Sequence, residues 1–191
     1  MAKTYRILVT GDFHIPFRAQ ALPKQLVETL NEEHFDLVII TGDLVQSYVL
    51  EPFKKFSVVV VRGNMDVGEA AHFPEIAYVN IPNANVRAVV FHGTGIYPRG
   101  EPMLLRGIAK KHGAEVIFTG HTHYPDVRKV LDTIIINPGS GTGVYGGGGG
   151  LGIPTWAIVE FSRRELFIEI HAVRRSYIEI MLRKRFTIAR E

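Results

Sequence analysis

The chain has 191 residues, of which 46% are hydrophobic and 21% charged, as is typical of a globular protein with a sizeable core. It contains no cysteine, which excludes disulfides, thiolate metal sites and cysteine nucleophiles. No apolar run approaches the ~20 residues that span a bilayer, and the first residues lack the apolar core of a signal peptide. We therefore expect a cytoplasmic protein with no membrane segment.

The net charge of +3 is concentrated at the C-terminal end. Residues 172–191 hold six Lys and Arg against two Glu, so the rest of the chain is nearly neutral. Such a stretch is either a solvated edge or a strip that binds nucleic acid or a protein partner. The excess is too modest to favour nucleic acid. Because no linker or repeat interrupts the sequence, residues 1–191 are interpreted as a single domain.

The first part of the chain alternates apolar strands with helices. The predicted strands are 5–10, 37–40, 58–61, 88–91 and 116–118, and the predicted helices are 19–33, a weaker one at 45–53, and 102–112. Short apolar runs that end at a glycine are typical of parallel strands covered on both faces. This alternation predicts an α/β fold with crossover connections.

From about residue 127 the predicted strands follow one another with short links. They are 127–131, 133–136, 155–161 and 165–173, whereas 178–182 fits either another strand or a short helix. Hairpins are expected here, and the simplest packing is two sheets face to face with helices outside. Between them, residues 137–152 include five consecutive glycines, Gly146–Gly150, and do not fit regular structure. This segment is either a floppy surface loop or a mobile rim over a site.

Each of the first five strands is followed by a glycine and by side chains that can bind metal. These side chains are Asp12, His14, Asp43, Asn64, Asp66, His92, His121 and His123. Successive ends of parallel strands lie at one edge of a sheet, where ligand sites form. Any one of these residues alone has an ordinary structural explanation, but five repeats of the pattern favour a shared site.

The chemistry that fits such a set is a two-metal centre. Two divalent cations ~3.5–4 Å apart can bind the attacking and leaving oxygens of a phosphoryl displacement, with a bridging carboxylate and a bridging hydroxide as nucleophile. Imidazole, carboxylate and amide ligands favour manganese, iron, zinc or cobalt over calcium or magnesium. We expect two divalent ions, with manganese as first choice and nickel, zinc, iron or cobalt as alternatives.

The ordered motifs Asp12-x-His14, Gly42-Asp43, Gly63-Asn64-x-Asp66, His92-Gly93 and Gly120-His121-x-His123 resemble those of the calcineurin-like metallophosphoesterases. The resemblance implies a four-layer α-β-β-α sandwich. It implies that Asp12, His14, Asp43 and His123 hold one metal. It also implies that Asp43, Asn64, His92 and His121 hold the other, with Asp43 bridging. Asn64, His92 and Asp66 would also take part in catalysis.

Other stretches resemble one member of that fold, the retromer subunit of vacuolar protein sorting. They are residues 12–18 with Leu22-Pro23, the segment 137–145, and Ile153-Pro154. That subunit works chiefly as a scaffold, whereas small prokaryotic relatives are metal-dependent phosphodiesterases. The resemblance therefore implies two rival functions: a phosphodiesterase acting on a small phosphodiester, or an interaction scaffold with a residual metal site. A homodimer through an exposed strand edge is a further alternative.

Two departures bear on the substrate. Met65 stands where many phosphatases of this family carry a histidine that protonates the leaving group, and Thr94 stands where a second histidine is common. Loss of a general acid typically lowers the rate ~10²–10⁴-fold. We therefore expect diesters or aryl phosphates to react faster than alkyl monoesters. Arg18, Arg62 and Arg99 are candidate phosphate ligands, and Asp66 is either a partial acid or a carboxylate that orients its loop.

Overall fold

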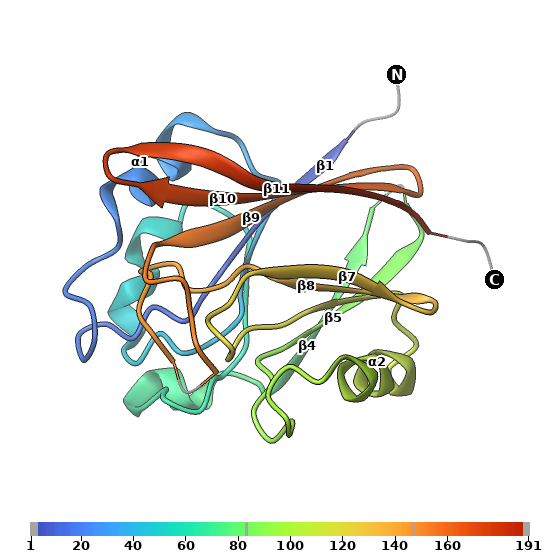
Figure 1. Cartoon of the computed structure of the whole chain (residues 1–191), viewed down its shortest axis with the longest axis horizontal. Helices are drawn as coiled ribbons and strands as arrows, with labels where there is room; N and C mark the ends of the chain where they lie inside the picture. The colour runs from blue at the N-terminus through green and yellow to red at the C-terminus, as the bar shows by residue number, and fades with distance from the viewer. Residues whose placement is uncertain (1–3, 83, 147, 189–191) are drawn as a thin grey trace.

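The computed structural model describes residues 4–82, 84–146 and 148–188. Its strands form two sheets that lie face to face (Figure 1). One sheet has the order β11-β10-β9-β1-β2-β3, with bounds Tyr177–Thr187, Glu165–Arg174, Thr155–Ser162, Tyr5–Thr10, Leu37–Ile40 and Val58–Val60. The other has the order β4-β5-β6-β8-β7, with bounds Ile76–Ile81, Val86–Phe91, Val116–Phe118, Thr133–Asn137 and Asp126–Val130.

Alternating side chains along the strands build the layers, because successive residues of a strand point to opposite faces. In β1, Ile7 and Val9 pack into the core between the sheets, whereas Leu8 packs into the outer core on the other face. In β6, Val116 and Phe118 face the inner core, and Ile117 faces outward. Both faces of these strands are therefore apolar.

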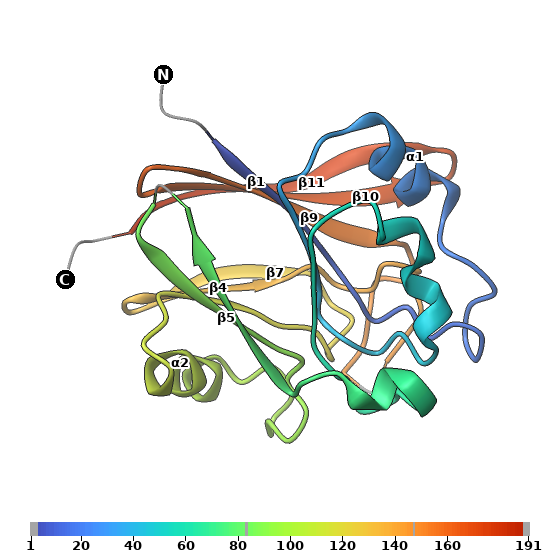
Figure 2. The ribbon, with the colours of Figure 1, turned by 180° about the vertical axis from the view of Figure 1, so that it is seen from behind.

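Helices cover the outer faces, as the view from behind shows (Figure 2). Helix α1 (Lys24–Glu32) and the 3₁₀ helix η1 (Ser47–Phe53) place Leu26 and Phe53 against the outer face of the first sheet. Helix α2 (Pro102–Lys111) places Leu105 and Ala109 against the second sheet. A second 3₁₀ helix, η2, spans Gly68–His72. The predicted α/β sandwich with helices outside two sheets is confirmed.

Several predicted elements need correction. The helix predicted over 19–33 is confined to Lys24–Glu32, because Pro23 disfavours helical geometry in the residue before it and lacks an N–H. The weak helix at 45–53 is a 3₁₀ helix with Pro52 inside it. Strand β4 was missed. The ambiguous segment 178–182 lies within β11, which pairs antiparallel with β10.

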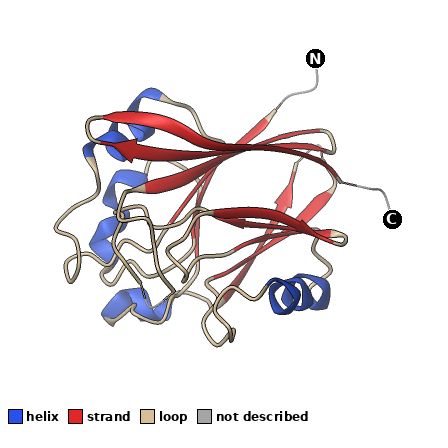
Figure 3. Cartoon of the chain, in the orientation of Figure 1, coloured by secondary structure: helices blue, strands red, loops and turns tan. Residues whose placement is uncertain are grey.

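The five strands with polar ends are divided between the sheets rather than placed in one. β1, β2 and β3 are parallel neighbours in the first sheet, and β5 and β6 are parallel neighbours in the second. Figure 3 shows that most loops gather at one end of the sandwich, away from the two termini. The site therefore forms where the carboxyl ends of the parallel strands of one sheet meet those of the other.

The basic C-terminal segment forms β11, as far as the structure describes it. Its arginines lie beside glutamates of β10: Arg183 Nε is 2.7 Å from Glu169 and Arg185 Nε is 2.8 Å from Glu165. These pairs neutralise part of the excess charge, which favours a solvated edge over a nucleic-acid strip. Among the described helices, none is both long and apolar enough to cross a bilayer.

Candidate metal centre

Two groups of buried side chains converge at the loop end of the sandwich. Asp12 and His14 follow β1, Asp43 follows β2, His92 follows β5, and His121 and His123 follow β6. One group consists of Asp12, His14, Asp43 and His123, and the other of Asp43, His92 and His121. In each group, one potential ligand atom per residue lies within 4.8 Å of all the others. Six of the seven predicted ligands are therefore brought together.

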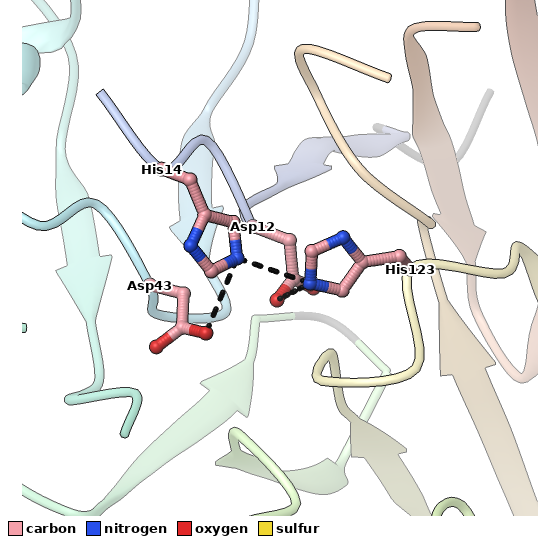
Figure 4. Close-up of side chains that lie close together, drawn as sticks. All are labelled: Asp12, His14, Asp43 and His123. Carbon is pink, nitrogen blue, oxygen red and sulfur yellow. Dashed lines mark hydrogen bonds and ion pairs between the residues drawn. The ribbon is translucent and has the colours of Figure 1, made fainter. Parts of the chain in front are cut away.

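The first group joins three different loops (Figure 4). His14 Nε2 is 3.4 Å from Asp43 Oδ2 and 3.0 Å from His123 Nε2. His123 Nε2 is in turn 3.4 Å from Asp12 Oδ1. These four side chains are at most 3% exposed. Two imidazoles and two carboxylates thus point their polar atoms at one small volume.

The second group shares Asp43 with the first. His92 Nε2 is 3.5 Å from Asp43 Oδ2 and 3.2 Å from His121 Nδ1. The seventh predicted ligand, Asn64, joins this group, because its Oδ1 is 3.3 Å from the same His92 nitrogen. The same carboxylate oxygen of Asp43 therefore faces both groups, which is the geometry required of a bridging ligand.

The backbone at these residues is unusual. Asp12, His14, Asp43, His121 and His123 all have positive φ, between 50° and 70°. This left-handed region is uncommon for residues other than glycine and costs on the order of 1 kcal/mol each. Such strain persists only where the surrounding structure enforces it, and it clusters at functional sites. Backbone strain at five of the seven predicted ligands therefore indicates a functional site.

The glycines of the motifs allow the loops to approach closely. A Cβ atom on Gly63 would lie 2.1 Å from Asp43 Oδ1 and 2.4 Å from its backbone nitrogen. Any side chain there would displace the shared carboxylate. The neighbouring backbone N–H of Met65 donates to Asp43 Oδ1 at 2.7 Å, which leaves Oδ2 to face the two groups.

Backbone carbonyls fix the orientation of two histidines. His92 Nδ1 lies 2.8 Å from the carbonyl of Thr41, and His123 Nδ1 lies 2.7 Å from the carbonyl of Val144. A carbonyl can only accept, so Nδ1 carries the proton in both rings and, in the neutral tautomer, Nε2 presents a lone pair to the site. This is how proteins orient metal-binding imidazoles. The two carbonyls are backbone groups and leave no signal in the sequence.

Burial and mutual contacts shift the pKa values strongly. Burial raises the pKa of Asp12 to about 6 and lowers that of His14 to about 4. Burial also opposes charge on His92 and Asp43. The hydrogen bond between them, the charges of neighbouring residues and backbone hydrogen bonds together outweigh burial, so the pKa of His92 is raised to about 9 and that of Asp43 is lowered to about 2. The pair therefore favours a positive charge beside the shared carboxylate.

The donor set fits divalent metal ions. Buried carboxylates are unfavourable unless they are paired or coordinate a cation. Here imidazole nitrogens face each other at 3.0 Å and 3.2 Å, a separation at which two lone pairs repel unless a proton or a cation lies near them. Mixed nitrogen and oxygen donors suit transition metals and zinc. The donor types and their geometry together thus support divalent metal binding at these residues.

Asp66 is placed differently from the other predicted residues. Its carboxylate accepts backbone N–H groups of Gly63 at 2.7 Å, Val45 at 2.8 Å and Asp43 at 3.1 Å. It belongs to neither group of the described residues that could hold a metal. Of the two roles considered from the sequence, these contacts favour the carboxylate that orients its loop. Asp66 ties the loop after β3 to the loop after β2.

The three candidate arginines differ in their surroundings. Arg62 pairs with Glu75 and donates to the carbonyl of Ala71 at 3.3 Å. Arg18 donates to the carbonyl of Tyr145 at 3.0 Å, so it anchors the glycine-rich segment. Arg99 is exposed, and its charge contributes to lowering the pKa of His121, after burial and His92. Arg99 is the arginine most available to a ligand.

The glycine-rich segment lies against the first group. A Cβ on Gly146 would lie 2.4 Å from His123 Cδ2, so only glycine permits this approach. Gly146 and Gly149 are joined by two backbone hydrogen bonds of 2.8 Å and 3.1 Å. Residue 147 of the predicted loop lies outside the described residues. The described part of this segment packs on His123, as expected of a rim beside the site. The sequence alone left open whether the segment was such a rim or a surface loop.

Comparison with known proteins agrees with this arrangement. The model of the calcineurin-like phosphoesterase superfamily domain matches residues 5–164. A probable metallophosphoesterase of Methanocaldococcus jannaschii is 34% identical over 73% of this chain and 69% of its own length. Another, from Methanothermobacter thermautotrophicus, is 33% identical over 70% and 76%. The chain therefore belongs to the calcineurin-like phosphoesterase superfamily, and these relatives support a hydrolase.

Solved structures share the fold along nearly the whole chain. Vacuolar Protein Sorting 29 (Vps29) from Cryptosporidium parvum is 22% identical, covers 96% of this chain and 98% of its own, and has a TM-score of 0.88. Vps29 from Entamoeba histolytica, solved with Zn²⁺, is 26% identical, covers 96% and 99%, and has a TM-score of 0.83. An archaeal phosphodiesterase is 23% identical, covers 86% and 99%, and has a TM-score of 0.63.

Proposed function

We propose that this protein is a phosphodiesterase that uses two divalent metal ions, with manganese as the first choice. The observation that carries the proposal is the position of Asp43 Oδ2, which lies 3.4 Å from His14 Nε2 in the first group and 3.5 Å from His92 Nε2 in the second. Bound divalent ions would supply the Lewis acidity and the activated water that hydrolysis needs. The substrate is proposed to be a small phosphodiester.

The residues of the chain would divide the work as follows. Asp12, His14 and His123 would hold one ion, and His92, His121 and Asn64 the other, with Asp43 shared. The carbonyls of Thr41 and Val144 would keep two imidazoles in the right tautomer. Asn64 is the exposed member of the set and would also contact substrate. Asp66 would hold the loops of Asp43 and Asn64 together.

The preference for diesters follows from the residues beside the second group. Met65 and Thr94 provide no imidazole, and Asp66 is committed to three backbone N–H groups. A poor leaving group would therefore depart without a strong proton donor, at a typical loss of ~10²–10⁴ in rate. Aryl diesters, whose leaving groups are stable as anions, would be turned over fastest.

The test is hydrolysis of bis-p-nitrophenyl phosphate by the manganese-loaded protein. Asp43→Asn should lower kcat/KM by more than about 10²-fold. Loss of a hydrogen bond to a metal ligand from outside the coordination sphere typically costs up to that much, and Asp43 would itself be a ligand. The matched control is Asp132→Asn, which changes an aspartate in the turn between β7 and β8. It should leave kcat/KM unchanged. If the wild-type protein binds two metal ions and hydrolyses no diester, the proposal fails.

A second candidate function is an interaction scaffold with a residual metal site. It is favoured by the fold shared with Vps29 over 96% of the chain and by the absence of an imidazole at Met65 and Thr94. The complete ligand set counts against it. Affinity purification from the native cell in the presence of a chelator would test it. A partner recovered in equal amounts would support the scaffold, and its absence would favour the enzyme.

Three further proposals concern the chain as a whole. One inner core joins residues of both sheets, including Ile39 of β2 and Ile136 of β8, which supports a single domain over residues 1–191. We also propose a cytoplasmic location and, as an alternative to a monomer, a homodimer through the exposed edge of β11.

A further inference from the structure

A cavity of about 310 Å³ lies beside the second metal-binding group. It is lined by the segment between β3 and β4, by the end of β5 and by the start of the loop that follows β5. Its charged lining residues are Arg62, Asp66 and Glu75. Asn64 connects it to the proposed centre, because its Oδ1 lies 3.3 Å from His92 Nε2. A ligand at the centre would therefore have one flank next to this cavity.

The charges around the cavity do not suit an anion. Its one cationic lining residue, Arg62, is already paired with Glu75 and donates to the carbonyl of Ala71 at 3.3 Å. The carboxylate of Asp66 accepts three backbone N–H groups. The lining side chains sum to a net charge of −1, which repels a phosphate group and any other anionic substituent.

The uncharged part of the lining suits an organic group. Phe91 is half-buried and, together with Ala71, gives the cavity an apolar wall. Thr94 and Asn64 add a hydroxyl and an amide, which can hydrogen-bond a neutral oxygen. A cavity of this size, with apolar walls and a few polar groups, is at the small end of the range for ligand pockets.

We propose that this cavity binds the neutral esterified alcohol of a phosphodiester, and prefers an aromatic or other partly apolar one. The proposal rests on the proposed function, because the cavity would select among the substrates of that centre. It excludes a terminal phosphate or a second anionic group from this position. The cavity would thus favour diesters by recognising the ester group itself, independently of proton donation.

Variants that fill the cavity test the proposal in the manganese-loaded protein. Ala71→Trp and the exposed Thr94→Leu should raise KM for bis-p-nitrophenyl phosphate about 10-fold or more. In methyl p-nitrophenyl phosphate the methyl ester can lie in the cavity, and it needs much less space than an aryl group. The KM for this substrate should therefore change less than about 3-fold. Lys111→Trp, at the exposed end of α2, is the control for an added indole and should change neither value. Metal content should stay at the wild-type ratio in all variants.

A binding measurement separates this inference from the proposed function. Phenol is uncharged at pH 7, because phenolic groups have pKa values near 10. Added to the zinc-loaded protein, it should shift the backbone amide NMR signals of Asn64 and Thr94. Ala71→Trp should abolish these shifts. If the wild-type protein hydrolyses no diester but shows these shifts, the proposed phosphodiesterase activity is refuted and the proposed binding in the cavity is supported. Unchanged KM values in both variants, with no phenol shifts, would overturn the cavity proposal alone.

Discussion

Replacing Gly146 with alanine should weaken one of the two proposed metal sites and spare the other. The added Cβ would lie 2.4 Å from His123 Cδ2 and 2.7 Å from its Nε2, the atom that faces Asp12 and His14. Gly146 does not have a positive φ, so alanine fits the backbone there and the clash is the dominant effect. The three atoms nearest to the added Cβ all belong to His123, so the perturbation acts on this side chain first.

The magnitude follows from the size of the overlap. Carbon atoms in contact lie about 3.5–4.0 Å apart, so the ring or the loop has to move by roughly 1 Å. Metal–ligand distances tolerate only about 0.2 Å. His123 cannot move freely, because its Nδ1 is held by the carbonyl of Val144 at 2.7 Å. We expect a loss of about 10–100-fold in affinity at this site, comparable with loss of an outer hydrogen bond to a ligand. That loss corresponds to about 1.4–2.8 kcal/mol.

The assay is metal stoichiometry and affinity under a competing chelator. Gly146→Ala should retain the ion held by His92 and His121 while the other is released at lower chelator concentration. Gly107→Ala is the control, since a Cβ there meets nothing within 4 Å. Gly107 lies in α2, so alanine should raise stability by about 0.5–1 kcal/mol without affecting metal binding.

Two results would refute the reasoning about Gly146. Unchanged affinity for both ions would mean that the glycine-rich segment does not press on His123. Equal weakening of both ions would mean that the segment supports the whole centre rather than one ligand. Thermal unfolding of each variant establishes that the fold is retained.

Other predictions concern stability. Asp66→Asn should lower the free energy of unfolding by about 2–3 kcal/mol, because a charged acceptor of three buried N–H groups is lost, and urea unfolding would measure it. A smaller loss than for an average surface substitution would contradict the tying role of Asp66. When each ion is present at 100 times its Kd, its removal by a chelator should lower Tm by about 5–10 °C. In Asp43→Asn, the Tm with and without chelator should differ by much less than in the wild type. Hydrogen bonds from Thr187 and Arg185 hold the pKa of Glu165 below its ordinary value of 4.5. A depressed carboxyl pKa stabilises the fold above that value, and the effect is lost as the pH falls through the folded-state pKa. The difference in urea midpoint between wild type and Glu165→Gln should therefore be present at pH 6 and shrink toward pH 3, and a difference that is constant with pH would contradict it.

The sequence predicted some elements of the fold better than others. The strand at 37–40 was predicted correctly because four apolar residues, followed closely by Gly42, are typical of a short strand buried on both faces. Strand β4 was missed because Pro74 lies just before it and Asn80 interrupts its apolar residues. Helix α1 was predicted five residues too early because periodicity extends through Leu22, whereas Pro23 fixes where the helix can begin.

The candidate site was more predictable than the fold that supports it. The sequence by itself determined the types and order of the proposed ligands, since Asp12, His14, Asp43, His121 and His123 each follow an apolar strand. It also determined that no thiolate chemistry is available. These are local properties, and the chain carries them whatever its tertiary fold.

Only the tertiary structure decided which atoms meet. The proposed ligands come from two sheets rather than one, and Asp43 Oδ2 lies near both groups only because the sheets pack face to face. The carbonyls of Thr41 and Val144, which orient His92 and His123, are backbone groups common to every residue type. Distances between residues more than 100 positions apart depend on packing, and packing is a property of the whole chain.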